Sequence, residues 1–225
     1  MAQYLKLFKT EADYEAVVGT ENEPQLSHII EDVEIKKKIN TNGHCYVDLG
    51  LPSGTLWACY NVGSSTETGY GNFYKYGQGA NVYNKNQADY TGVETPLASS
   101  ADTATQVMGG DWHMPLSGQC QELIDNTNHE WVFSMNGTGV NGVKFISKKD
   151  PSKYIFIPAS GNYYNGRLVC RGTHCNVWAS TSWNTTNAYY FHAINQSSSP
   201  DLNPNSIKVW STSRYFGYSV RGVIG

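Results

Sequence analysis

Two cysteines in the last third of the chain have a type and spacing that could support chemistry. Cys170 and Cys175 lie five positions apart, and Arg171 could help to create the electropositive surroundings that lower the pKa of a thiol. Such a pair could bind a soft metal ion or carry out thiol redox chemistry. The simpler interpretation is two unrelated cysteines, and we expect no catalysis from them.

The histidines do not form a metal-binding motif. Five of them are spread over the chain after residue 40: His44, His113, His129, His174 and His192. They do not have the spacing of a motif such as His-Glu-x-x-His. The segment 201–205 could offer oxygen ligands to calcium, although a polar turn is the simpler interpretation. We therefore expect neither a metal ion nor another cofactor.

The composition excludes several classes of protein. The chain has 225 residues, of which 16% are charged and 13% are aromatic, and it contains 22 glycines. The aromatic and glycine content favours a turn-rich, β-dominated domain and argues against both a disordered chain and a long helical bundle. A net charge of −3 gives no reason to expect binding to nucleic acid.

Targeting signals and a disulfide framework are not expected either. The chain begins Met-Ala-Gln-Tyr-Leu-Lys with no apolar run behind it, so we expect no signal peptide. No stretch approaches the roughly 20 apolar residues of a membrane span, so we expect no membrane insertion. The five cysteines are odd in number and irregularly spaced, which suggests reduced thiols.

Short strands between polar turns must position the residues named above. The first 43 residues carry much of the charge, and we expect them to form a small module for assembly or attachment, followed by a main domain at 44–225. A helix is expected at 117–126. Short apolar runs predict strands at 46–49, 131–135, 142–147, 154–158, 177–180, 188–194 and 218–223.

One of these strands has two chemically different faces. Alternate side chains of a strand point to opposite sides, so Tyr190, His192 and Ile194 should share one face, and Phe191 and Ala193 the other. A phenol, an imidazole and an alkyl group side by side suit a binding surface better than a core. We therefore expect the first of these faces to contact a ligand.

Several motifs in chain order resemble the Fibrobacter succinogenes major paralogous domain family. They cover about residues 44–223 and lie at 46–58, 112–115, 122–124, 157–161, 178–181 and 217–221. The resemblance implies a C-type lectin fold in the branch related to formylglycine-generating enzyme. This is an α+β fold with many short strands, one or two helices and long loops.

A narrower resemblance lies in the last third of the chain. The segments 166–178, 187–192 and 214–221 are similar to the variable region of diversity-generating retroelement proteins, which here would span about 161–225. In that family, reverse transcription misreads template adenines, so that AAC and AAT codons become diversified. The resemblance implies a rigid lectin-like scaffold that displays a hypervariable ligand-binding face.

The resemblance also implies which residues face the ligand. Substitution at the first two bases of those codons cannot produce Trp, Lys, Gln, Glu or Met, so Trp178 and Trp210 should not be diversified positions. The predicted variable ligand-binding residues are Val169, Cys170, His174, Tyr190, His192, Ile194, Asp201 and Phe216. Further candidates for ligand contact are Tyr164, Trp183, Trp210 and Ser213.

Other large side chains are expected to build the scaffold. Trp57, Trp112, Trp131 and Trp178 fall in or near apolar runs and are predicted to be core residues. Arg221 is predicted to bond backbone carbonyls rather than a ligand.

Together these observations predict a non-enzymatic, hypervariable receptor-binding or adhesion protein, encoded by a phage or prophage. Its partner would be a protein or glycan receptor on a target cell surface, and a homo-oligomer would add avidity. We expect it on the virion, at the tail or surface, or in the cytoplasm before assembly. Two alternatives remain: an adhesin of fixed specificity for a glycan or protein, and a formylglycine-generating-type thiol oxidase that uses Cys170 and Cys175.

Overall fold

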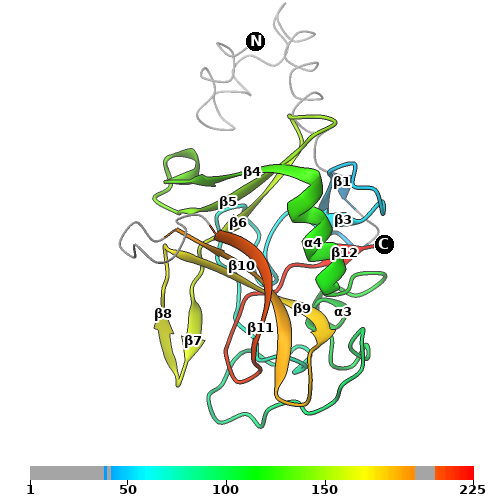
Figure 1. The fold of residues 1–225 in the computed structure, drawn as a ribbon, viewed down its shortest axis with the longest axis vertical. Coiled ribbons are helices and arrows are strands. Elements are labelled where there is room, and N and C mark those ends of the chain that lie inside the picture. The colour runs from blue at the N-terminus through cyan, green and yellow to red at the C-terminus, as the bar shows by residue number, and fades with distance from the viewer. Residues whose placement is uncertain (1–37, 40–41, 196–205) are drawn as a thin grey trace, which may run out of the picture. The chain divides into compact units, whose positions relative to one another are not determined.

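The computed structural model describes residues 38–39, 42–195 and 206–225 (Figure 1). Within this part the protein is a mixed α/β unit, mostly of short strands, with two α-helices and four small sheets. The predicted module at 1–43 lies outside the described residues except at its end, and so does Asp201. None of the helices in the described residues has the length and apolar character needed to cross a bilayer.

The first sheet joins the two ends of the described unit. Its antiparallel strands follow the order β1-β2-β3-β12. Gly50 and Gly54 have positive φ angles of 69° and 78°, which a side chain would disfavour, and they allow the turn between β2 and β3. The strands are β1 (Lys38–Ile39), β2 (Cys45–Asp48), β3 (Leu56–Ala58) and β12 (Val223–Ile224).

The second sheet, with strand order β4-β5-β6, carries one side of the main core. Along β5 and β6 the inward residues Val143, Phe145, Ile155 and Ile157 are at most 1% exposed. The strands are β4 (Thr127–Val132), β5 (Gly142–Ser147) and β6 (Tyr154–Pro158), and the 3-10 helix η2 (Met135–Gly137) connects the first two.

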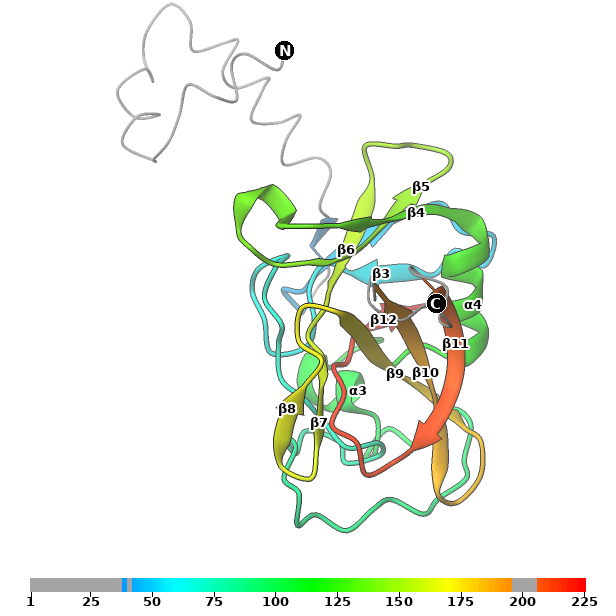
Figure 2. The same ribbon diagram turned by 60° about the vertical axis from the view of Figure 1, so that its left-hand side comes forward.

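The third sheet is the longest, with strand order β11-β10-β9, and the hairpin β7–β8 lies beside it (Figure 2). Helix α4 (Ser117–Asn126) packs against all three of its strands and buries Cys120 and Leu123. The short helix α3 (Thr103–Met108) begins at Asp102, whose carboxylate accepts hydrogen bonds from the backbone of Thr105 and Met114. The remaining strands are β7 (Asn162–Tyr164), β8 (Arg167–Val169), β9 (His174–Ser182), β10 (Asn187–Ile194) and β11 (Ser206–Ser213).

Two apolar clusters form the core. The first contains Trp57 and residues from β5, β6, β9 and β10, and the second contains Trp112 and Trp178 with several tyrosines. These three tryptophans are at most 1% exposed, which confirms the prediction that they are core residues. Trp131 is only half-buried and packs against the rim of the first cluster.

The structure confirms some predicted elements and corrects others. The helix at 117–126 and the strands at 142–147 and 154–158 have the predicted bounds. The predicted strand at 131–135 is wrong, because β4 ends at Val132 and Ser134 turns the chain with a φ of 50°. The predicted strand at 218–223 is also wrong: Tyr218 and Ser219 make only isolated bridges, and β12 begins at Val223.

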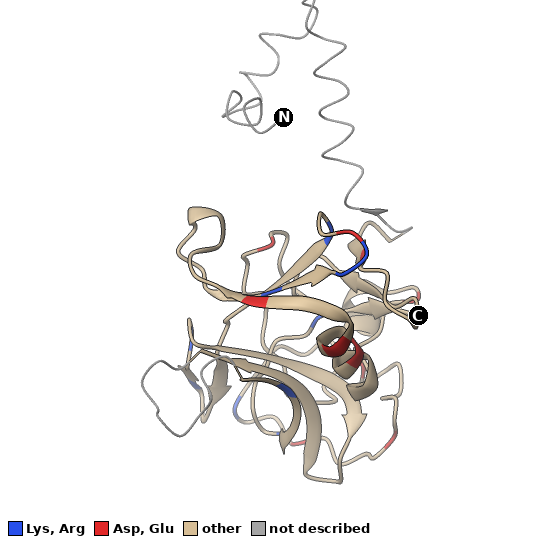
Figure 3. Ribbon diagram, turned by 45° about the horizontal axis from the view of Figure 1, so that its top comes forward, with Lys and Arg blue, Asp and Glu red and all other residues tan. Residues whose placement is uncertain are grey.

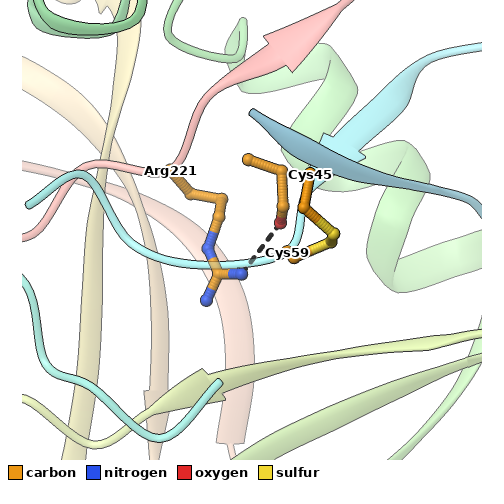
Figure 4. The surroundings of a disulfide bond; sticks show 4 residues. Cys45, Cys59 and Arg221 are labelled. Atoms are coloured by element: carbon orange, nitrogen blue, oxygen red, sulfur yellow. Dashed lines mark hydrogen bonds between the residues drawn. A yellow bond between two sulfur atoms is a disulfide. The ribbon is translucent and has the colours of Figure 1, made fainter. Parts of the chain in front are cut away.

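The prediction that all cysteines are reduced is wrong as well. Cys45 and Cys59 form a disulfide with their Cα atoms 5.4 Å apart (Figure 4). The antiparallel register of β2 and β3 places Tyr46 opposite Ala58, so the next residues outward, Cys45 and Cys59, also face each other. Sequence reasoning missed this pairing because the two cysteines are 14 residues apart. Which residues of β2 and β3 face each other depends on the length of the turn between the strands. Cys120, Cys170 and Cys175 carry free thiols.

Loss of the Cys45–Cys59 disulfide is expected to lower the free energy of unfolding by about 3 kcal/mol, because it closes a short loop in the unfolded chain. The measurement is urea denaturation of the wild-type protein and of the Cys45→Ser/Cys59→Ser variant, each with and without dithiothreitol. The reductant should destabilise the wild type to the level of the variant and leave the variant unchanged. Equal stability of all four samples would contradict the prediction.

Candidate functional site

A pocket of about 390 Å³ opens between the hairpin β7–β8, the strands β9 and β10, and the segment 215–218. This segment runs between β7 and β9 (Figure 2). On the side of β7, Gly217 exchanges two backbone hydrogen bonds with Tyr163. On the side of β9, the backbone N–H of Trp178 donates to the carbonyl of Ser219, the residue that follows the segment. The pocket is lined by Asn162, Tyr164, Val169, Cys170, His174, Asn176, Tyr190, His192, Tyr215, Phe216 and Tyr218.

Strand alternation explains which side chains reach this pocket. In the antiparallel pair β9–β10, His192 lies opposite Asn176 and Tyr190 lies opposite Trp178, so these four side chains share one face. The intervening Phe191 and Ala193 point the other way and belong to the main core. The predicted separation of Tyr190 and His192 from Phe191 and Ala193 is therefore confirmed, although Tyr190 is only 8% exposed and belongs to the second core cluster. That the face of Tyr190 and His192 contacts a ligand stays a prediction.

Six of the eight predicted variable residues line this one pocket, although they come from separate segments of the chain: Val169, Cys170, His174, Tyr190, His192 and Phe216. Ile194 lies at the end of β10, is only 6% exposed and is not among the lining residues. Asp201 falls outside the described residues.

The four further candidates for ligand contact lie in different places. Tyr164 lines the pocket, whereas Trp183, Trp210 and Ser213 do not. Trp210 lies opposite Tyr190 across the β10–β11 pair, so it extends the same face, and it is 57% exposed. Trp183 is 56% exposed and packs on Tyr189, whose side chain belongs to the opposite face of β10. Ser213 shares that opposite face through its pairing with Asn187.

Four lining residues were missed by sequence reasoning: Asn162, Asn176, Tyr215 and Tyr218. The alternation rule could have found Asn176, since it stands two positions after His174 on the same strand. Tyr215 and Tyr218 reach the pocket only because segment 215–218 folds between β7 and β9. No pattern within that segment indicates this neighbour.

One wall of the pocket is a stack of aromatic rings. The Phe216 ring lies 4.5 Å from that of Tyr215 and 5.6 Å from that of Tyr218, and both pairs are nearly parallel. Tyr164 adds a further ring 5.4 Å from Phe216, and Tyr190 lies 4.9 Å from Tyr218. Aromatic side chains have few rotatable bonds, so this wall offers a large contact area with little loss of conformational entropy on binding.

The opposite part of the pocket carries two imidazoles. The rings of His174 and His192 lie 5.7 Å apart. Burial, together with the positive charges that His174 and Lys208 can carry, lowers the pKa of His192 to about 4, and burial also lowers the pKa of His174. Both rings are therefore neutral at pH 7.

The pocket holds little formal charge. No carboxylate occurs among the lining residues, and Lys208 is the one charged residue in the strands β9, β10 and β11 (Figure 3). Aromatic rings, amides and neutral imidazoles therefore define what the site can recognise. Such groups favour apolar and hydrogen-bonding contacts over ion pairing.

Acid is expected to destabilise the protein through His192. Its pKa in the folded state, about 4, is below its ordinary value of 6.5, so the unfolded chain binds more protons. Above pH 6.5, His192 is neutral in both states and should not lower the free energy of unfolding. As the pH drops from 6.5 to 4, this group should lower the free energy of unfolding by about 3 kcal/mol in total.

The measurement is urea denaturation at several pH values between 4 and 7.5. Carboxylates also titrate in the lower part of this range, so the comparison is with the His192→Asn variant. Its unfolding free energy should fall less steeply between pH 6.5 and 4 than that of the wild type. Equal slopes would rule out the proposed contribution of His192.

The structure separates the two cysteines that the sequence places five apart. Cys170 is exposed, has a φ of 58° and lines the pocket. Cys175 is fully buried in the main core, where its thiol donates a hydrogen bond to the carbonyl of Ile157 at 3.3 Å. Burial raises the pKa of both thiols, which disfavours the reactive thiolate. This arrangement gives no support to a shared thiol site.

Two buried arginines hold the framework around the pocket. Arg214 donates to the backbone carbonyls of Tyr90, Gly92, Asn184 and Asn187, and its guanidinium lies over the ring of Tyr76. It thereby ties the end of β11 to the β9–β10 turn and to the long loop before α3.

Arg221 also donates hydrogen bonds to buried acceptors from several segments. It is fully buried and donates to the carbonyls of Ala58 and Phe156 and to the side chain of Asn61, at 2.7–3.0 Å. Figure 4 shows it beside the Cys45–Cys59 disulfide. The prediction that this arginine bonds backbone carbonyls is confirmed.

The described residues thus form a mixed α/β unit in which the pocket beside β8, β9 and β10 is aromatic and nearly uncharged. They contain no group of three or more His, Cys, Asp or Glu side chains placed to hold a metal ion. Comparison with protein-family models, with curated proteins and with solved structures found no match to this chain.

Proposed function

We propose that this protein is a retroelement-diversified ligand-binding protein with a C-type lectin fold, and that the pocket lined by β8, β9, β10 and segment 215–218 is part of its variable binding surface. Its ligand would be a protein or glycan receptor on a target cell surface. The protein would act in receptor binding or adhesion, as a phage or prophage product carried on the virion.

The observation that carries this proposal is the convergence of the predicted variable residues. Val169, Cys170, His174, Tyr190, His192 and Phe216 are separated by up to 47 positions in sequence, and they line one pocket. Four of them, Val169, Cys170, His174 and Phe216, were named by the resemblance alone, and their position beside Tyr190 and His192 is what a variable region that builds one surface would produce. The mixture of short strands, two helices and long loops is what the C-type lectin fold would require.

The division between surface and scaffold supports the same proposal. Trp178 packs against the rings of Tyr190 and Tyr218 and is fully buried, as are Arg214 and Arg221. A binding surface can tolerate many substitutions when the residues that set its geometry lie below it. The Cys45–Cys59 disulfide suits a protein that works in an oxidising exterior.

Deep sequencing of the codons for residues 161–225, in a population that carries this gene, tests the proposal. Substitutions should concentrate at the six lining positions named above and at their neighbours on the same face. The codons for Trp178, Arg214 and Arg221 serve as internal controls and should not vary. A uniform sequence in many independent isolates would overturn the proposal and favour an adhesin of fixed specificity.

A further inference from the structure

The two imidazoles of the pocket stand on neighbouring strands and on the same face. His192 of β10 lies opposite Asn176 of β9, so His174, two positions before Asn176, is its diagonal neighbour. Their ring centroids are 5.7 Å apart, and both rings line the open pocket. Two imidazoles at this separation can approach one small ion from adjacent directions.

The hydrogen bonds of Asn176 determine which nitrogen of His192 carries the proton. The amide nitrogen of Asn176 donates to Oδ1 of Asn162 at 3.4 Å, so its own oxygen faces His192. That oxygen lies 2.8 Å from Nδ1 of His192 and can only accept a hydrogen bond. His192 therefore carries its proton on Nδ1 and has a lone pair on Nε2.

The hydroxyl group of Thr173 leads to the same conclusion for His174. Thr173 donates its single hydroxyl hydrogen to the carbonyl of Cys170 at 3.1 Å. Its oxygen lies 2.9 Å from Nδ1 of His174 and accepts a hydrogen bond from that atom when the hydroxyl hydrogen is on the carbonyl. In this arrangement His174 is also protonated on Nδ1. Among the described residues neither Nε2 atom has a hydrogen-bond partner.

We propose that Nε2 of His174 and Nε2 of His192 together bind a borderline transition-metal ion such as Zn²⁺, Co²⁺ or Ni²⁺. A metal-binding histidine commonly donates its other N–H to an oxygen acceptor, as both rings do here. Imidazole suits these metals, whereas Ca²⁺ and Mg²⁺ require oxygen ligands that the lining residues do not supply as carboxylates.

The ion would keep open coordination positions. No third His, Cys, Asp or Glu joins the two imidazoles in a ligand group within the described residues, so water or a donor atom of a bound ligand would complete the shell. This inference does not rest on the proposed function, because it concerns the two residues present in this sequence, whether or not these positions vary among related chains.

The test is calorimetric titration of the 225-residue protein, without a tag, with Zn²⁺, accompanied by Co²⁺ absorption spectra. We expect one ion per chain, with at least about a tenfold loss of affinity in His174→Asn and in His192→Asn. His129 is an exposed imidazole outside this pocket, and His129→Asn is the matched control that should bind like the wild type. Wild-type affinity in both pocket variants, or no binding by the wild type, would overturn the proposal.

A second measurement on the wild type covers the case in which a pocket variant does not fold. Long-range ¹H–¹⁵N spectra resolve the ring nitrogens of the six histidines of the chain and distinguish their tautomers. His174 and His192 should show protonated Nδ1 atoms without metal, and their Nε2 signals should shift more than those of the other histidines when Zn²⁺ is added. Shifts at other histidines alone would overturn the proposal.

Discussion

Replacing Arg221 with methionine is expected to lower the free energy of unfolding by about 4 kcal/mol. The guanidinium is fully buried and supplies charged hydrogen bonds to the carbonyls of Ala58 and Phe156 and to Asn61. Each such bond contributes about 1.5–3 kcal/mol, and methionine would leave all three acceptors buried without a partner. The cost of burying a charge, visible in a pKa of Arg221 lowered to about 9, offsets part of this loss.

Loss of the Arg221 side chain should weaken the packing of two sheets against each other. Its three acceptors belong to β3, to the loop that follows β3 and to β6, so the side chain links the first sheet to the second. A loss of 4 kcal/mol is a large fraction of the roughly 5–15 kcal/mol that stabilises a typical domain. We expect a decrease in melting temperature of about 10 °C.

Guanidinium denaturation and calorimetry of Arg221→Met and Arg221→Lys would measure this. Lysine keeps the charge but cannot reach three acceptors with a planar fork, so it should also destabilise the protein. Arg167 is exposed on β8, and Arg167→Met is a control that should change stability by less than about 0.5 kcal/mol. A similar small change for Arg221→Met would show that the interior tolerates these acceptors without a donor.

Replacing Trp178 with alanine is expected to cost about 3–5 kcal/mol and to disorder the aromatic wall of the pocket. The indole is fully buried and its N–H donates to the carbonyl of Tyr74 at 2.9 Å. Its ring contacts those of Tyr76, Tyr190 and Tyr218 at centroid distances of 5.6, 6.2 and 4.5 Å. The cavity left by alanine would remove the support beneath two residues that line the pocket.

Two further variants separate the causes. Trp178→Phe keeps a ring beneath the pocket and loses the hydrogen bond to Tyr74, so it should cost only about 1–3 kcal/mol. Trp183 is exposed, and Trp183→Ala should change stability little. Near-ultraviolet circular dichroism should lose intensity in Trp178→Ala more than in Trp178→Phe. An alanine variant as stable as the wild type would contradict a scaffold role for Trp178.

Local sequence patterns correctly predicted the helices and strands whose buried residues follow a simple apolar pattern along the segment. The helix α4 and the strands β5 and β6 have the expected bounds, because each has an apolar face or run delimited by polar turns. The strand β11 was not predicted, since its sequence is largely polar. It is an edge strand in which only alternate residues, Ile207 and Val209, pack against the core.

The candidate site was partly predictable for a related reason. Alternation along β10 assigned Tyr190 and His192 to one face, and the resemblance to a variable region supplied Val169, Cys170, His174 and Phe216. Neither argument could find Tyr215 and Tyr218 or separate Cys170 from Cys175. Those outcomes depend on which segments lie side by side and on which side of β9 is buried.

By itself, the sequence determined the predominance of short strands, three of the four tryptophans predicted for the core, the carbonyl-binding role of Arg221 and the two faces of β10. All of these follow from side-chain chemistry and from the periodicity of a single segment. Only the tertiary structure decided that six predicted residues share one pocket, that Cys45 bonds Cys59, and that Cys175 lies in the core. Each of these depends on pairing between distant segments, and the energy of that pairing comes from packing and hydrogen bonds that no local pattern encodes.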